Sequence, residues 1–204
     1  TFCYNIINGL PIKINDPDAL ISLVYIDDVI ARFIMAMDQQ ISDDALVEVQ
    51  PCYRINVGAL ADQLQAFSRS RVDLVTQPVG EGLVRALYST YVSYLAPDQF
   101  TYQVPKHEDS RGVFVEMLKT RDSGQFSYFT AHPGVTRGGH YHHSKTEKFL
   151  VIKGKACFRF RHITSNEFFE LVAEGGKPTI VETVPGWTHD ITNIGDEELI
   201  VMLW

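Results

Sequence analysis

The chain has few cysteines and no long apolar run. Its three cysteines, Cys3, Cys52 and Cys157, are far apart and odd in number, so they do not make a disulfide framework, and a reducing cytoplasm is the expected location. No uninterrupted apolar stretch approaches the roughly 20 residues that a membrane-spanning helix needs. The sequence therefore predicts a cytoplasmic protein that does not enter a membrane.

Positive charge is also scarce. Eighteen Lys and Arg residues stand against 25 Asp and Glu residues, which gives a formal net charge of -7. Nucleic acids and anionic membranes are bound through clustered positive charge, so both are excluded as expected partners. A small phosphorylated ligand stays possible, because one or two well-placed arginines are enough to hold it. A length of 204 residues, 45% of them hydrophobic, suits one large or two small domains.

The first residues, Thr1-Phe2-Cys3, are neither an initiator methionine nor a signal peptide, and we expect the sequence to be a fragment. Up to about residue 95, apolar residues at helical spacing predict helices near 29–37, 57–67 and 81–95, with short strands near 23–26 and 53–55. Asp27 or Asp28 and Asn56 are expected to cap the first two helices.

After about residue 100 the periodicity becomes that of strands. Ala156, Phe158 and Phe160 alternate with more polar neighbours, which predicts a half-buried strand. Further strands are predicted near 113–117, 148–152, 179–184 and 199–203, separated by glycine turns. We therefore predict an α+β chain in which residues 1–95 form one domain and residues 96–204 an all-β domain, a small antiparallel barrel or jelly roll.

A group of possible metal ligands lies within the predicted barrel. His140 and His142 are two residues apart, so on a strand they project to the same side, and Glu147 can return to that side across a short turn. His189 follows the turn Pro185-Gly186 far downstream. A His-x-His pair alone is more often a surface or core feature than a ligand pair. Three imidazoles and one carboxylate, however, form a site for a divalent transition metal with room for water or substrate.

The spacing around these residues carries a family resemblance. Gly-x5-His-x-His-x4-Glu-x6-Gly, from Gly134 to Gly154, and Pro-Gly-x2-His-x3-Asn, from Pro185 to Asn193, match both cupin signature motifs. Segments 109–116 and 136–141 are similar to nucleotide-sugar 3-epimerases of the dTDP-4-keto-6-deoxyhexose type. Segment 24–29 is similar to the C-terminal half of extended short-chain dehydrogenase/reductases. Together these features resemble the CapF family of bifunctional capsular polysaccharide synthesis enzymes and their O-antigen relatives.

The resemblance implies a place in nucleotide-sugar biosynthesis for capsule or O-antigen, on the route to UDP-N-acetyl-L-fucosamine. In the family, the cupin epimerises C3 of a UDP-2-acetamido-2,6-dideoxy-4-hexulose, a UDP-4-keto-6-deoxy-N-acetylhexosamine, and the reductase then reduces C4 with NADPH. It also implies a divalent metal, with zinc expected, and a homodimer.

Roles for individual residues follow from the same resemblance and from the chemistry. His140, His142, Glu147 and His189 are the expected metal ligands, and their metal would polarise the ketone. Arg111 and Arg137 are candidates for binding the diphosphate or the sugar. The catalytic base is sought among His143, Lys145, Tyr128 and Asp190, with His132 as a further candidate; His140 matches the base of metal-free epimerases but is expected here to be a ligand.

The parts needed for reduction are not visible in the sequence. No glycine-rich nucleotide loop follows a strand in the first half. Two Tyr-x3-Lys pairs occur, at Tyr102–Lys106 and Tyr141–Lys145, but neither is placed on a helix. We therefore expect residues 1–95 to be the substrate-side remnant of the reductase and NADPH to bind only the full-length enzyme. Two other readings stay open: a non-catalytic metal cupin that serves folding and dimerisation, and a cupin oxygenase.

Overall fold

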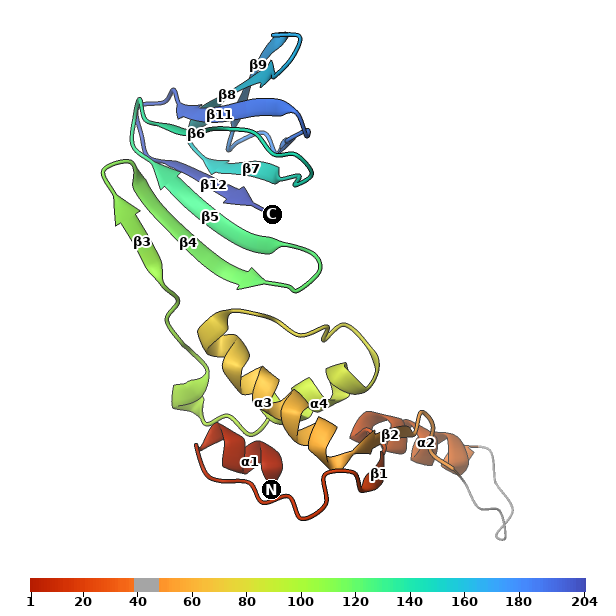
Figure 1. Ribbon diagram of the computed structural model, residues 1–204. Helices are drawn as coiled ribbons and strands as arrows, with labels where there is room; N and C mark the ends of the chain where they lie inside the picture. The colour runs from red at the N-terminus through yellow and green to blue at the C-terminus, as the bar shows by residue number, and fades with distance from the viewer. Residues whose placement is uncertain (39–47) are drawn as a thin grey trace. The chain divides into compact units, whose positions relative to one another are not determined.

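The computed structural model describes residues 1–38 and 48–204, which form two compact units, Thr1–Tyr102 and Gln103–Trp204 (Figure 1). The division falls after a short 3-10 helix, η1 (Pro97–Gln99), whereas the sequence placed it near residue 95. Among the described residues, no helix is both long enough and apolar enough to cross a membrane.

The first unit packs helices around a small aromatic core. Phe67, Leu64 and Tyr91 are buried together, and the Phe67 ring meets that of Tyr88 edge-on at 5.1 Å between centroids. The Asn56 side chain caps its helix by accepting a hydrogen bond from the Ala59 amide at 2.7 Å. The elements are α1 (Phe2–Ile7), β1 (Leu20–Leu23), α2 (Ile26–Asp38), β2 (Tyr53–Asn56), α3 (Val57–Asp73) and α4 (Gly82–Val92), with β1 and β2 antiparallel.

The three predicted helices of this unit are confirmed, but the first strand is shifted. β1 ends at Leu23 and α2 begins at Ile26, so the predicted strand 23–26 was placed too far along the chain. Asp27 and Asp28 lie in the first turn of α2 rather than before it, where their negative charge favours the positive end of the helix dipole. The sequence did not predict α1.

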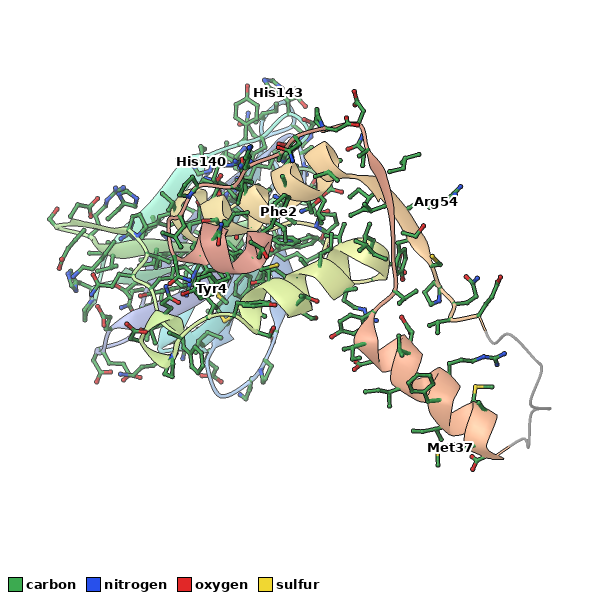
Figure 2. All side chains as sticks on the ribbon, turned by 90° about the horizontal axis from the view of Figure 1, so that it is seen from below. Phe2, Tyr4, Met37, Arg54, His140 and His143 are labelled. Atoms are coloured by element: carbon green, nitrogen blue, oxygen red, sulfur yellow. The ribbon has the colours of Figure 1, made fainter. Side chains whose placement is uncertain are left out.

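The apolar stripe of α2 is largely exposed in the described part of the chain. Phe33 is 64% exposed and Met37, near the end of the helix, is 81% exposed (Figure 2). Ile30 and Ile34 on the same stripe are also exposed. An amphipathic helix of this kind normally buries its stripe, so this face has no covering partner among the described residues.

The second unit consists of two antiparallel sheets packed face to face (Figure 1). One sheet has the order β10-β7-β12-β5-β4-β3 and the other the order β6-β11-β8-β9. The strands are β3 (Lys106–Asp109), β4 (Gly112–Lys119), β5 (Gln125–Ala131), β6 (Thr136–His140), β7 (Lys148–Lys153), β8 (Lys155–His162), β9 (Phe168–Glu174), β10 (Ile180–Glu182), β11 (Trp187–Asn193) and β12 (Leu199–Leu203).

Strand alternation places one apolar set between the sheets. The buried cluster is contributed by both sheets and includes Phe129, Phe149, Phe158, Ile191 and Val201. The predicted all-β region with its alternating strand at 156–160 is therefore confirmed. β3, β5, β9 and β11 were not predicted individually, because their apolar residues are fewer or are interrupted by polar ones.

Asn193, the last residue of the second motif, is completely buried. Its side-chain amide donates to the carbonyls of Ala131 and Glu197 at 2.8 Å each, and its oxygen accepts from the Gly195 amide at 2.9 Å. The side chain thus joins β11 to the end of β5 and to the turn before β12.

We predict that Asn193→Ala lowers the free energy of unfolding by about 1–3 kcal/mol, because it leaves buried backbone groups unpaired. Chemical denaturation followed by circular dichroism measures this change. The exposed Glu198→Ala on the same turn is the control and should change stability by less than about 0.5 kcal/mol. Equal effects of the two substitutions would contradict the structural role of Asn193.

Candidate metal centre

Four side chains from separate segments of the second unit converge on one point. His140, His142, Glu147 and His189 each offer one ligand atom, and these atoms all lie within 4.8 Å of one another. They come from the end of β6, the turn after it, the residue before β7 and the start of β11. The structure thus brings together the four residues that the sequence proposed as ligands.

β11 and β6 deliver two of the imidazoles. His189 points between the sheets and is 3% exposed, and it pairs in register with His140, their ring centroids 4.7 Å apart. Gly138 makes this approach possible. Its φ is +93°, and a Cβ there would lie 2.9 Å from the His189 carbonyl oxygen. A residue with a side chain would push β6 away from β11.

The other two ligand candidates lie outside regular strands. The sequence suggested that His140 and His142 share a strand. β6 ends at His140, however, and His142 lies on the turn that follows. The His142 carbonyl accepts from the Gly186 amide at 3.1 Å, which ties this turn to the one before β11. The Glu147 amide donates to Thr183 Oγ1 at 2.8 Å, which fixes the carboxylate before β7.

The Glu147 carboxylate is the electrostatic centre of the cluster. Its Oε2 lies 3.0 Å from His142 Nε2 and 3.4 Å from His189 Nε2, and its Oε1 lies 2.7 Å from Lys145 Nζ. Hydrogen bonding to His189 is the largest of the effects that hold the pKa of this carboxyl far below its usual range; Lys145 and His142 add to it, against the opposing effect of burial.

The donor set fits a divalent cation. Burial, and then the neighbouring His189 and His142, lower the pKa of His140, so its imidazole is neutral and its lone pair is free to bind a metal at neutral pH. An ionised carboxylate and three imidazoles within one small space are ligands that zinc, iron and manganese all accept.

Both predicted substrate arginines line the cavity beside the cluster. This cavity of about 160 Å³ is bounded by Arg111, Arg137, His140, Glu147 and His189, together with apolar side chains that include Phe114, Phe129 and Leu203. The sequence did not predict these apolar walls, although inward alternation on β4 and β5 is the signal that could have identified them.

The two guanidinium groups are already engaged by the protein. Arg111 bonds the Asp109 carboxylate through Nε and Nη2, and these bonds lower the pKa of Asp109 to about 2. Arg137 donates from Nε to the Thr130 carbonyl at 2.9 Å and from Nη2 to the Val113 carbonyl at 3.4 Å. Burial lowers the pKa of Arg137.

The candidates for the base are scattered. Lys145 contacts Glu147 directly. His143 (Figure 2) is exposed two residues earlier on the same turn, and its ring centroid lies 5.2 Å from that of Tyr141. His132 is exposed on the turn between β5 and β6.

Tyr128 and Asp190 lie on the opposite faces of their strands. Each is adjacent in sequence to a cavity residue, Phe129 or His189, so strand alternation points it away from the cavity. Asp190 Oδ1 lies 3.7 Å from Arg159 Nη1 on that outer face. The structure does not bring these two side chains to the cluster.

We predict that His189→Ala loses its divalent metal, and that added metal no longer raises its melting temperature, because one of the four ligands is removed. Elemental analysis and thermal melting with and without metal measure both effects. His143→Ala is the matched control and should keep wild-type metal content. Full metal occupancy in His189→Ala would remove His189 from the ligand set.

The chain was compared with known proteins and protein families. Residues 107–204 match the family described as the polysaccharide biosynthesis C-terminal domain. The whole chain is 62% identical over 204 residues to the UDP-2-acetamido-2,6-beta-L-arabino-hexul-4-ose reductase of Pseudomonas aeruginosa strain PA103. The chain spans 55% of the length of that relative.

Solved structures agree with this match over the full chain. A crystal structure of CapF with the inhibitor 3-isopropenyl-tropolone superposes with a TM-score of 0.94 at 36% identity, covering 100% of this chain and 59% of the CapF chain. A crystal structure of CapF from Staphylococcus aureus in space group C2221 gives a TM-score of 0.93 at 36% identity, covering 100% of this chain and 60% of the CapF chain.

Proposed function

Because the chain belongs to the CapF family, we propose that it acts in nucleotide-sugar biosynthesis for capsule or O-antigen polysaccharide. The proposed substrate is a UDP-4-keto-6-deoxy-N-acetylhexosamine, a UDP-2-acetamido-2,6-dideoxy-4-hexulose. The second unit epimerises its C3, and the intact enzyme then reduces C4 with NADPH. The observation that carries the proposal is the convergence of four ligand side chains beside a cavity lined by two arginines.

The epimerisation exchanges one proton and changes no oxidation state. The C3 proton leaves one face of the sugar, the electron pair moves into the adjacent C4 carbonyl, and a proton from solvent returns to the other face. His140, His142, Glu147 and His189 would hold a divalent metal, which we propose to be zinc. Its chemistry there would be that of a Lewis acid, favouring the negative charge that develops on the C4 oxygen.

The residues of the chain hold and orient the sugar around that point. Arg111 and Arg137 flank the cavity, and their remaining N–H groups donate to oxygens of the substrate. The apolar wall containing Phe114 and Phe129 excludes water from the ring, which strengthens each polar contact made there.

Two of the base candidates share the turn beside the cluster, His143 and Lys145. Exchange measured in His143→Ala and Lys145→Ala separates them, since loss of the base lowers kcat by about 10²–10⁴-fold. Tyr128 and Asp190 face away from the cavity, so we place neither in the proton transfer.

For residues 1–95 we propose the substrate-side part of the reductase, with the rest of that domain supplying the NADPH site. The exposed stripe of α2, with Phe33 and Met37, supports this assignment because such a stripe is normally buried against another element. The relative named as a reductase is also longer than this chain. A homodimer in the cytoplasm completes the proposal.

The epimerase proposal is tested by solvent exchange. The zinc-loaded chain, incubated in heavy water with the UDP-4-keto sugar, is expected to incorporate deuterium at C3, as detected by NMR. Chain stripped with EDTA should lose this exchange and regain it on adding zinc. A folded, zinc-loaded chain that leaves C3 unlabelled would contradict the proposal and favour a non-catalytic cupin that serves folding and dimerisation.

The CapF structure with a tropolone inhibitor suggests a second test, because tropolone carries two adjacent oxygens that chelate metals. We expect 3-isopropenyl-tropolone to bind the zinc-loaded chain and to inhibit the C3 exchange competitively, whereas the stripped chain should not bind it. Calorimetry measures both forms. Equal affinity for the loaded and stripped chains would show that the inhibitor does not bind through the metal.

A further inference from the structure

A second and larger cavity adjoins the metal cluster. It measures about 510 Å³, and its walls are the turn Asp122–Gln125, the segment Lys145–Lys148, and Leu203 and Trp204. Glu147 and Leu203 line both this cavity and the one that contains the cluster. The two spaces therefore have these two side chains as common walls, which places the larger cavity next to the cluster.

The sizes of the two cavities fit different parts of a ligand. The cluster cavity, at 160 Å³, falls below the range of about 300–1,000 Å³ that is typical of small-molecule sites, so it accommodates little more than a sugar ring. The larger cavity lies within that range. A nucleotide sugar placed with its sugar at the cluster must leave its nucleotide outside the smaller space.

The walls of the larger cavity suit a flat ring joined to an anion. Trp204 is 51% exposed, and its backbone is fixed by two hydrogen bonds with Lys148, at 3.0 and 2.7 Å. The backbone of Trp204 is therefore fixed beside the cavity that the residue lines. Half of the residue is open to solvent, and indole faces stack on nucleobases. Lys145 lines this cavity, and its Nζ lies 2.7 Å from Oε1 of Glu147, a residue that lines both cavities.

The charge of this region favours an anion once the cluster holds a cation. The charged residues lining the larger cavity balance, with Asp122 and Glu147 against Lys145 and Lys148. A divalent cation held by the cluster would add two positive charges next to them. The Lys145 ammonium on Glu147 Oε1 can then share its remaining N–H groups with a phosphate.

The arginines on the other side of the cluster are less suited to a diphosphate. Arg111 already donates hydrogen bonds from Nε and Nη2 to the Asp109 carboxylate. Arg137 donates from the same two nitrogens to backbone carbonyls. Neither presents the free two-point fork that makes arginine a strong phosphate ligand, so both are better placed for single contacts to the sugar.

We propose that the larger cavity binds the uridine diphosphate half of the substrate, with the uracil stacked on Trp204 and a phosphate on Lys145. The inference rests on the proposed UDP-sugar substrate, and it assigns Lys145 to binding rather than to proton transfer. The sugar then lies between Lys145 on one side and Arg111 and Arg137 on the other.

UDP itself is the probe, because its binding requires no turnover. Calorimetry with the zinc-loaded chain should detect UDP binding, and Trp204→Leu should weaken it by about 5- to 100-fold, the effect of losing one base–aromatic stack. Trp187→Phe is the matched control, since Trp187 lies on β11 outside this cavity, and it should bind UDP as wild type does. Zinc content and circular dichroism confirm that each variant is folded.

A fluorescence measurement avoids any change at Trp204. The chain has two tryptophans, so Trp187→Phe leaves Trp204 as its only one, and UDP should quench its emission. An unchanged emission on saturation with UDP, a Trp204→Leu affinity within twofold of wild type, or no detectable UDP binding by the wild-type chain would each overturn the inference.

The role of Lys145 has its own readout in the C3 exchange reaction. Lys145→Ala should raise KM by about tenfold or more with kcat retained, and Lys145→Arg should restore most of the loss, as expected for a charge-assisted contact. A fall in kcat with unchanged UDP affinity would instead make Lys145 the base and overturn its assignment to phosphate. If the wild-type chain exchanges the C3 proton but does not bind UDP, only the proposed UDP site is refuted. If the chain binds UDP through Trp204 but does not exchange the C3 proton, only the epimerase proposal is refuted.

Discussion

The contact between the Glu147 carboxylate and the surrounding imidazoles links the two sheets of the second unit. Glu147 precedes β7 in one sheet, whereas His140 and His189 belong to β6 and β11 in the other. A cation bound between them would join the sheets at one end of the apolar core. Metal binding at this cluster would therefore couple stability to chemistry, because the bonds to the cation would also join the two sheets.

Backbone groups near the cluster help to hold the four candidate ligand side chains in place. Gly138 lets β6 approach the His189 carbonyl at a distance that a side chain would prevent. Thr183 holds the Glu147 amide, and the Gly186 amide holds the turn that carries His142. Each of these features positions a candidate ligand side chain from outside the cluster, and supporting contacts of this kind commonly set metal affinity.

The sequence identified the four side chains that converge, but it did not predict the cavity around them. The four ligand candidates have a recognisable spacing, and two of them lie on strands whose partners are fixed by apolar alternation. The orientation of Tyr128 and Asp190 depends on which neighbour faces the core, and the spacing of polar residues alone did not reveal that. The larger cavity with Trp204 depends on the pairing of β12 with β7, a long-range contact that no local pattern encodes.

The first unit shows the same limit from the other side. Its helices follow from local apolar spacing and the Asn56 cap, but the sequence does not show what covers the exposed stripe of α2.

The central claim is that His140, His142, Glu147 and His189 bind one divalent cation, and X-ray absorption spectroscopy of the zinc-loaded chain tests it most directly. The account predicts a first shell of nitrogen and oxygen atoms at about 2.0–2.2 Å, with the outer-shell scattering of three imidazoles. A shell containing sulfur, or one without imidazole scattering, would contradict it.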